Sequence, residues 1–195
     1  LIQSFIEGNQ ADFNTLVWRW EKSIYNFILR YLGQKELARD LTQKTFIRVY
    51  KNIHKLRDAS RFSSWIYQIA SNLCKDELKK KTHRHLLSID TIQENSENGH
   101  LMPEELIDNE NNHPDSTLNQ KQIGMIIQKA LQQIPEEQRI VIIMKEYQGL
   151  KFKEIAEALG EPLNTVKSRM YYGLNGLRKI FEKWNITEEV LSYEM

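Results

Sequence analysis

Charge is distributed along this 195-residue chain in three blocks. Residues 1–85 carry 16 basic and 8 acidic side chains, residues 86–120 carry 8 acidic side chains and no Lys or Arg, and residues 121–195 carry 11 basic and 10 acidic side chains. The acidic stretch is rich in Asn and Ser and has no sustained apolar periodicity, which is typical of a linker. This pattern is hard to explain for a single small-molecule enzyme, and it predicts two modules joined by an acidic, flexible tether.

The composition favours helices and an intracellular setting. Pro and Gly are few, with 4 and 8 residues, so little interrupts a helical pattern. A single cysteine excludes an intramolecular disulfide and suits a reducing cytosol. No apolar run approaches the roughly 20 residues of a membrane span. We therefore expect an all-α, cytoplasmic protein that does not insert into membranes.

The first module has the apolar spacing of three amphipathic helices. One ends near Gly33, a second runs from about residue 35 to 53, and a third begins with Ser63 or Ser64 as its N-cap. The aromatic residues of the first helix follow its apolar stripe and are expected in the core. Trp65 also lies on an apolar stripe, so the core is favoured over a base-stacking role for this residue.

Polar and basic side chains gather on the other faces of this module. A loop before the third helix contains Arg57, Arg61 and Phe62, and an aromatic ring beside cations suits unstacked bases. The second helix carries Asp40, Gln43 and Lys44 within about one turn. The third helix presents Asn72, Lys75, Lys79 and Lys80. The basic end of this helix fits either a nucleic-acid contact or a solvated helix terminus.

The second module contains the spacing of a helix-turn-helix. Pro135 is expected at the first position of a helix that Gly149 closes. Ala156, Gly160 and Val166 then follow at separations of four and six residues. A small Ala allows two helices to cross closely, Gly permits a left-handed turn, and Val fills the core between them. The alternative is a helical hairpin that does not bind DNA.

Angular position divides the second helix of this motif into two faces. The residues expected inward are Val166, Met170, Leu174, Leu177 and Phe181. Those expected outward are Asn164, Thr165, Ser168, Tyr172, Asn175 and Lys179. The short polar groups near the helix start are those that a recognition helix would place against base edges. Lys167, Arg169 and Arg178 lie on the flanks and suit phosphate contacts. Gly173 and Gly176 are unusual inside a helix and indicate either a close backbone approach or fraying.

Four segments together resemble the extracytoplasmic-function (ECF, group IV) sigma factors of bacterial RNA polymerase. They are DLTQKTFIRVY from Asp40, RFSSWIYQIASNLCKDEL from Arg61, IPEEQRIVIIMKEYQGLKFKEIAEALG from Ile134 and NTVKSRM from Asn164. The resemblance covers nearly the whole chain except the linker and about the last dozen residues. It implies sigma region 2 in residues 1–85, an acidic linker in 86–117, sigma region 4 in 118–183 and a tail in 184–195.

The resemblance also implies a role for each candidate site. Asp40, Gln43 and Lys44 would contact the clamp of core polymerase, and the second domain would lie near its flap. The −10 promoter element would be recognised and opened by Arg57, Arg61, Phe62, Asn72, Lys75, Lys79 and Lys80. The −35 element would be read by Asn164, Thr165, Lys167, Ser168, Arg169, Tyr172, Asn175 and Lys179. An anti-sigma protein is a further expected partner.

Three positions depart from the usual pattern of this family. Lys44 stands where an acid is common, Tyr172 stands where Arg is common, and Lys79 stands where Arg is usual. Lys79 keeps its charge but cannot make the bidentate contacts of a guanidinium. A stand-alone helix-turn-helix regulator is the main alternative function, but it would need neither the first module nor the tether.

No enzymatic site is expected in this sequence. No phosphate-binding Gly loop, paired acids or Ser-His-Asp arrangement is visible, so we expect no catalytic residue and no cofactor. His83 and His85 lie near Cys74, but no fourth ligand stands nearby and we expect no metal.

Overall fold

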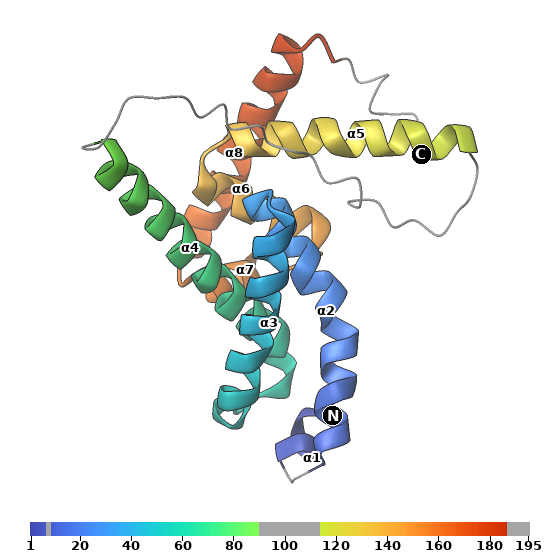
Figure 1. The fold of residues 1–195 in the computed structure, drawn as a ribbon, viewed down its shortest axis with the longest axis vertical. Coiled ribbons are helices and arrows are strands. Elements are labelled where there is room, and N and C mark those ends of the chain that lie inside the picture. The colour runs from blue at the N-terminus through green and yellow to red at the C-terminus, as the bar shows by residue number, and fades with distance from the viewer. Residues whose placement is uncertain (7–8, 90–113, 187–195) are drawn as a thin grey trace. The chain divides into compact units, whose positions relative to one another are not determined.

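The computed structural model describes residues 1–6, 9–89 and 114–186, and it describes residues 3, 6, 82–89 and 114–121 by their backbone alone. The described residues form helices and turns without a β-strand, which confirms the all-α prediction (Figure 1). The chain divides into two compact units. The helices before residue 90 belong to the first unit, and most helical residues after 113 belong to the second.

The first unit is built around two long helices that pack against each other (Figure 1). After the short helix α1 (Ile2–Ile6), α2 (Gln10–Leu32) is capped at its start by Asn9, whose side chain accepts a hydrogen bond from the backbone N–H of Ala11. It ends as predicted at Gly33, whose φ of 73° suits a residue without Cβ. The chain then reverses into α3 (Lys35–Asn52).

The third long helix begins slightly earlier than the sequence predicts. Two short 3₁₀ turns, η1 (Ile53–Lys55) and η2 (Ala59–Arg61), lead into α4 (Phe62–Ile89). Asp58 caps the turn η2 and accepts hydrogen bonds from the backbone N–H and the hydroxyl of Ser60. The expected caps, Ser63 and Ser64, therefore lie inside the helix.

The core of the first unit is apolar and rich in aromatic rings. The Trp20 ring lies 5.4 Å from that of Phe62 and 6.1 Å from that of Tyr67, and Tyr67 also meets Phe27 edge-on. These contacts confirm that the aromatic stripe of α2 faces the core. Other buried members of this core include Leu16, Ile24, Ile28, Leu41, Val49, Ile66 and Ala70.

The second unit contains most of the predicted helix-turn-helix, of which Glu157–Gly160 are grouped with the first unit. Its helices are α5 (Pro114–Gln133), α6 (Glu136–Ile142), α7 (Phe152–Leu159) and α8 (Leu163–Lys183), with a π-helical turn η3 (Ile143–Tyr147) after α6. Gly149 and Gly160 have φ values of 65° and 66° and end the preceding helical segments as predicted. Pro135 is the N-cap of α6, one position before the expected one.

Two glycines allow α8 to pack closely on its neighbours. A Cβ at Gly173 would lie 2.8 Å from Cδ1 of Ile142 and 3.2 Å from Cβ of Gln138. A Cβ at Gly176 would lie 3.1 Å from Cγ2 of Ile134. Both positions lie inside a continuous helix, so of the two predicted alternatives the close approach is correct and fraying is not.

The predicted linker and tail lie mostly outside the described residues. The described helices α4 and α5 include residues 86–89 and 114–117, which the sequence assigned to the linker, whereas 90–113 are not described. Residues 187–195 of the tail are likewise outside. None of the described helices is both long and apolar enough to cross a membrane.

Candidate nucleic-acid and protein interfaces

The polar cluster of α3 forms one exposed surface. Asp40, Gln43 and Lys44 are all exposed and lie within one turn. The Lys44 ammonium and the Asp40 carboxylate form an ion pair of 2.5 Å, with side chains that are 51% and 47% exposed. Lys44 thus has its counter-ion on the same helix, and the surface carries no net charge from this pair.

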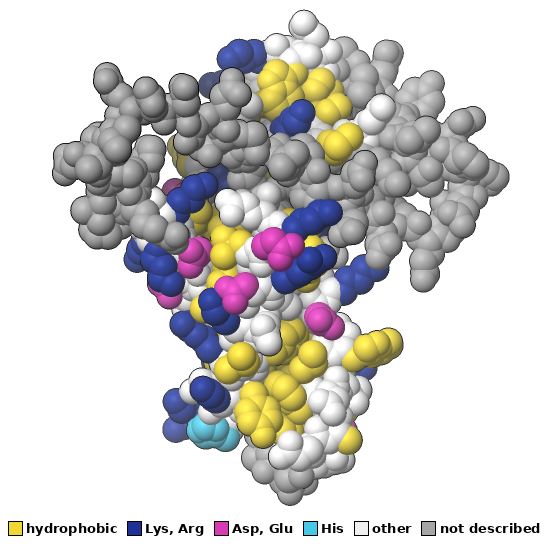
Figure 2. All heavy atoms as spheres, viewed as in Figure 1, with side chains coloured by type: hydrophobic (Ala, Val, Ile, Leu, Met, Phe, Trp, Pro, Cys, Tyr) yellow, Lys and Arg dark blue, Asp and Glu magenta, His cyan; other side chains and the backbone are white. Residues whose placement is uncertain are grey.

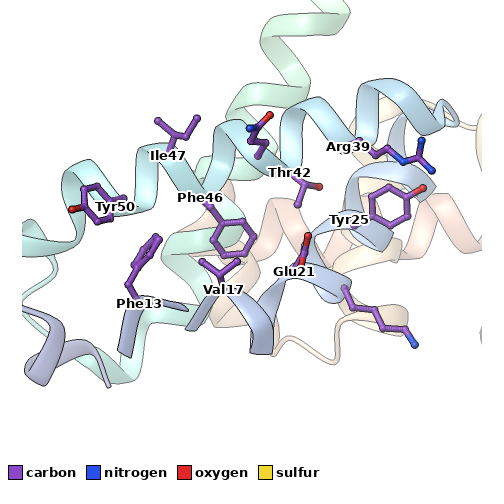
Figure 3. Close-up of a pocket in the computed structure, with 11 residues that line it drawn as sticks. Phe13, Val17, Glu21, Tyr25, Arg39, Thr42, Phe46, Ile47 and Tyr50 are labelled. Carbon is purple, nitrogen blue, oxygen red and sulfur yellow. The ribbon is translucent and has the colours of Figure 1, made fainter. Parts of the chain in front are cut away.

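An apolar groove of about 650 Å³ lies beside this cluster, between α2 and α3 (Figure 3). Gln43 belongs to its lining, and Phe46 points across the groove toward Val17. On the molecular surface, hydrophobic side chains gather over this end of the two helices (Figure 2). The full lining is Phe13, Val17, Glu21, Lys22, Tyr25, Arg39, Thr42, Gln43, Phe46, Ile47 and Tyr50.

Sequence reasoning missed this groove. Ile47 and Tyr50 are 46% and 45% exposed, although both are large and mostly apolar. The Tyr50 ring contacts Phe13 at 5.0 Å and Phe5 at 5.5 Å, which fixes one end of the groove. The sequence of α3 could have indicated this groove, because Ile47 and Tyr50 follow Gln43 at spacings of four and seven and therefore share its face of the helix.

The loop before α4 exposes its cations and buries its aromatic ring. Arg57 and Arg61 are exposed, but Phe62 is only 4% exposed and packs on Trp20 and Trp65. Hydrogen bonds from the Ser60 hydroxyl and backbone N–H lower the pKa of the Asp58 carboxyl and hold the turn. The structure does not place Phe62 beside the two arginines as an open platform, so a base can stack on this ring only after the aromatic cluster opens.

The predicted stripe of α4 is formed. Asn72 and Lys79 are exposed and Lys75 is half-buried, at helical spacings of three and four. Lys80 lies off this stripe and makes a 3.4 Å ion pair with Glu77. The backbone of this face is helical throughout, so three of the four residues share one surface.

The outward face of α8 largely matches the prediction. Asn164, Ser168, Tyr172 and Lys179 are exposed, and Thr165 and Asn175 are half-buried. The Ser168 hydroxyl donates to the carbonyl of Thr165 at 3.0 Å, which leaves its oxygen free to accept. This helix therefore presents short polar groups on the side away from its core, as a recognition helix does.

Two residues of α8 differ from the expected arrangement. Arg169 is on the flank as predicted, but its guanidinium makes a 3.1 Å ion pair with Glu161 and its side chain is 24% exposed. Leu174 was expected inward and is 47% exposed, which corrects that assignment. Position 174 lies at the edge of the buried stripe, whose centre is taken by Gly173 against α6.

The part of the chain with described side chains offers no metal site, since no group of three His, Cys, Asp or Glu residues is close enough. Cys74 is buried, and burial raises the pKa of its thiol above the ordinary value. A neutral buried thiol is a poor metal ligand and a poor nucleophile. The side chains of His83 and His85 are outside the described set.

Both units match known protein families. Residues 16–84 match Sigma-70 region 2, and residues 124–175 match Sigma-70, region 4. The first match contains the polar cluster of α3, the loop and the stripe of α4. The second contains the start of α8 up to Asn175, but not Lys179.

Curated relatives match over most of their length. The chain is 31% identical over 173 residues to the ECF RNA polymerase sigma-E factor of Escherichia coli K12, covering 88% of this chain and 87% of the relative. It is also 31% identical over 178 residues to the ECF RNA polymerase sigma factor SigW of Bacillus subtilis 168, covering 91% and 93%.

Solved structures share the fold at lower identity. The sigma factor RpoE of Bartonella quintana, solved with the anti-sigma factor NepR, has a TM-score of 0.67 and 19% identity, covering 88% of this chain and 97% of that one. CnrH, solved with the cytosolic domain of CnrY, has a TM-score of 0.64 and 16% identity, covering 93% and 95%.

Proposed function

Because this chain belongs to the ECF sigma factors of the sigma-70 family, and is therefore an alternative sigma factor that directs transcription initiation, we propose a division of labour between its units. The first unit binds core RNA polymerase and the −10 element, and the second binds the −35 element and lies near the flap. The acidic residues 86–117 connect them. The polymerase supplies the chemistry, so this chain has no catalytic residue and acts in the cytoplasm.

The polymerase clamp is bound by the surface that combines Asp40, Gln43 and Lys44 with the adjoining groove. This assignment is supported by the apolar groove that lies directly beside the half-exposed ion pair of Asp40 and Lys44. Apolar area provides most of the affinity of such an interface, and exposed ion pairs contribute little. The same groove is the proposed site for an anti-sigma protein, which then competes with the polymerase.

The −10 element is held by the loop and by α4. The exposed guanidinium groups of Arg57 and Arg61 and the stripe of Asn72, Lys75 and Lys79, with Lys80 beside it, provide cations for a separated strand. Binding energy from captured bases opens the duplex without nucleotide hydrolysis by this subunit. We expect Arg61→Ala to impair promoter opening more than initial binding.

The −35 element is read by α8. The observation that carries the whole proposal is the outward row of Asn164, Ser168 and Tyr172 on a helix-turn-helix that follows a region 2 match in the same chain. Lys167 and Lys179 contact phosphates beside these residues. The other residues of α8 that contact the −35 element are Thr165, Arg169 and Asn175.

Transcription with purified bacterial core polymerase on a genomic fragment library tests the proposal. We expect the full chain to start transcription at a limited promoter set, and a variant with Ile47→Glu in the groove to lose binding to core polymerase. Trp18→Ala is the matched control, because Trp18 lies on α2 outside the groove and is 83% exposed. A chain that does not bind core polymerase but binds its target duplex alone would be a stand-alone regulator.

A further inference from the structure

An exposed pair of aromatic rings lies on the outward side of α8. Tyr171 and Tyr172 are 65% and 61% exposed, and their ring centroids are 5.5 Å apart at an angle of 72°. The periodicity of the sequence assigned Tyr172 to the DNA-facing set but not Tyr171. Neighbouring exposed rings of this size mark a contact surface more strongly than scattered apolar residues do.

The pair belongs to a continuous uncharged patch. Its residues are Ser168, Tyr171, Tyr172 and Asn175. The last three follow Ser168 by three, four and seven positions, so all four lie on one face of the helix. We call these four residues the tyrosine patch. It offers two phenol rings, a hydroxyl and an amide, and no formal charge.

The rim of the tyrosine patch is cationic. Lys167, Arg178 and Lys179 are exposed around it, and α8 has no acidic residue before Glu182. The remaining cation of this stretch, Arg169, makes an ion pair with Glu161. An uncharged centre inside a cationic rim is complementary to duplex DNA, where phosphates flank the base edges.

We infer that the tyrosine patch reads thymine methyl groups in the major groove, an inference that rests on the proposed −35 role of α8. The C5-methyl of thymine is the apolar group among the major-groove edges, whereas guanine presents two acceptors that suit Arg or Lys. None of the four residues of the patch is Arg or Lys, so their own contacts favour thymine over guanine. Tyr171 is therefore a specificity residue together with Tyr172.

The test uses the holoenzyme and removes single methyl groups from the DNA. The preferred −35 element is selected from a randomised library, and each thymine is then replaced by deoxyuridine, which differs by the methyl alone. We expect at least one position at which this replacement weakens binding about fourfold, the effect of one buried methyl group. In the double variant Tyr171→Ala, Tyr172→Ala, the ratio of thymine to deoxyuridine affinity falls to one.

Tyr147→Ala is the control, because Tyr147 is 39% exposed on η3 in the same unit but outside α8. It should keep the ratio of the unaltered protein. A gain-of-function variant, Tyr172→Arg, should shift the selected base from thymine toward guanine.

Three outcomes overturn the inference while specific initiation persists: a selected element without thymine, a ratio of one at every thymine, or an equal ratio in the protein and its double variant. A holoenzyme that does not start transcription specifically contradicts the proposed function instead, so the two failures are distinguishable.

Discussion

The two regions that we propose contact DNA, the loop before α4 and helix α8, differ in how they place aromatic and cationic side chains. In the first unit, Phe62 is buried against Trp20, while Arg57 and Arg61 are exposed. In α8, Tyr171 and Tyr172 are exposed, while the Arg169 side chain is only 24% exposed beside Glu161. Arg61 also pairs with an acid, Glu157, but its side chain stays 60% exposed. The first arrangement suits contacts to the phosphate backbone, and the second suits contacts to base edges. Under the proposed function, the same residue types would therefore serve affinity in one unit and base discrimination in the other.

The largest expected effect tests whether Phe62 is a structural residue. Phe62→Ala should reduce the free energy of unfolding of the first unit by about 3–5 kcal/mol, because a buried ring is replaced by a cavity. Chemical denaturation followed by circular dichroism measures this loss. Trp18→Ala, at an 83% exposed position, should change it by only about 0.5 kcal/mol or less. Equal losses from both substitutions would contradict the buried role of Phe62.

A second substitution tests the packing of α8 on α6, which positions the exposed tyrosines of α8. Gly173→Ala should destabilise the second unit by about 1–3 kcal/mol, because its Cβ would overlap Ile142 and crowd Gln138. Thermal unfolding measures the effect. Gly176→Ala is the milder counterpart, since its nearest contact would be 3.1 Å from Ile134. Greater damage at position 176 than at 173 would refute the packing argument.

The contrast between affinity and discrimination predicts a difference in salt dependence. The double variant Lys75→Ala, Lys79→Ala should lower the slope of log affinity against log salt for single-stranded −10 DNA by about 0.7 for each phosphate that the protein no longer neutralises. Tyr172→Ala should leave the slope for −35 duplex binding unchanged. Titration of the holoenzyme at several salt concentrations measures both slopes. A slope that changes with the tyrosine and not with the lysines would reverse the comparison.

The smallest expected effect concerns Arg169. Glu161→Gln removes its counter-ion, so the guanidinium becomes available to a phosphate. Because both side chains are partly exposed, we expect duplex affinity to rise only about threefold, within the range of surface ion pairs. Arg169→Ala should weaken binding evenly across sequences. Weaker binding by the Glu161 variant would show that the ion pair positions α8.

Helix ends were predictable where a glycine adopts a positive φ. Gly33, Gly149 and Gly160 end their segments because only a residue without Cβ adopts this conformation at little cost. The start of α4 was less predictable, because Asp58 caps a 3₁₀ turn that leads directly into the helix. Asp58, Ser60, Ser63 and Ser64 all satisfy the same local preference.

The outward faces of the candidate sites were predictable from the sequence. The burial or exposure of each individual side chain was not. Periodicity assigned Ser168 and Tyr172 correctly because the buried stripe of α8 is regular. It could not show that Phe62 is covered by Trp20, since a loop position has no period. Nor could it show that Ile47 stays exposed, because burial of an apolar residue depends on which helix packs over it.

The missing side chain at Gly173 lets α6 rest directly against the main chain of α8. This close approach positions α8 from its inner side, against Ile142 and Gln138. We therefore expect substitutions at the exposed positions of α8 to leave the helix in place. A few substitutions on the exposed face of α8 should therefore be enough to change its promoter preference.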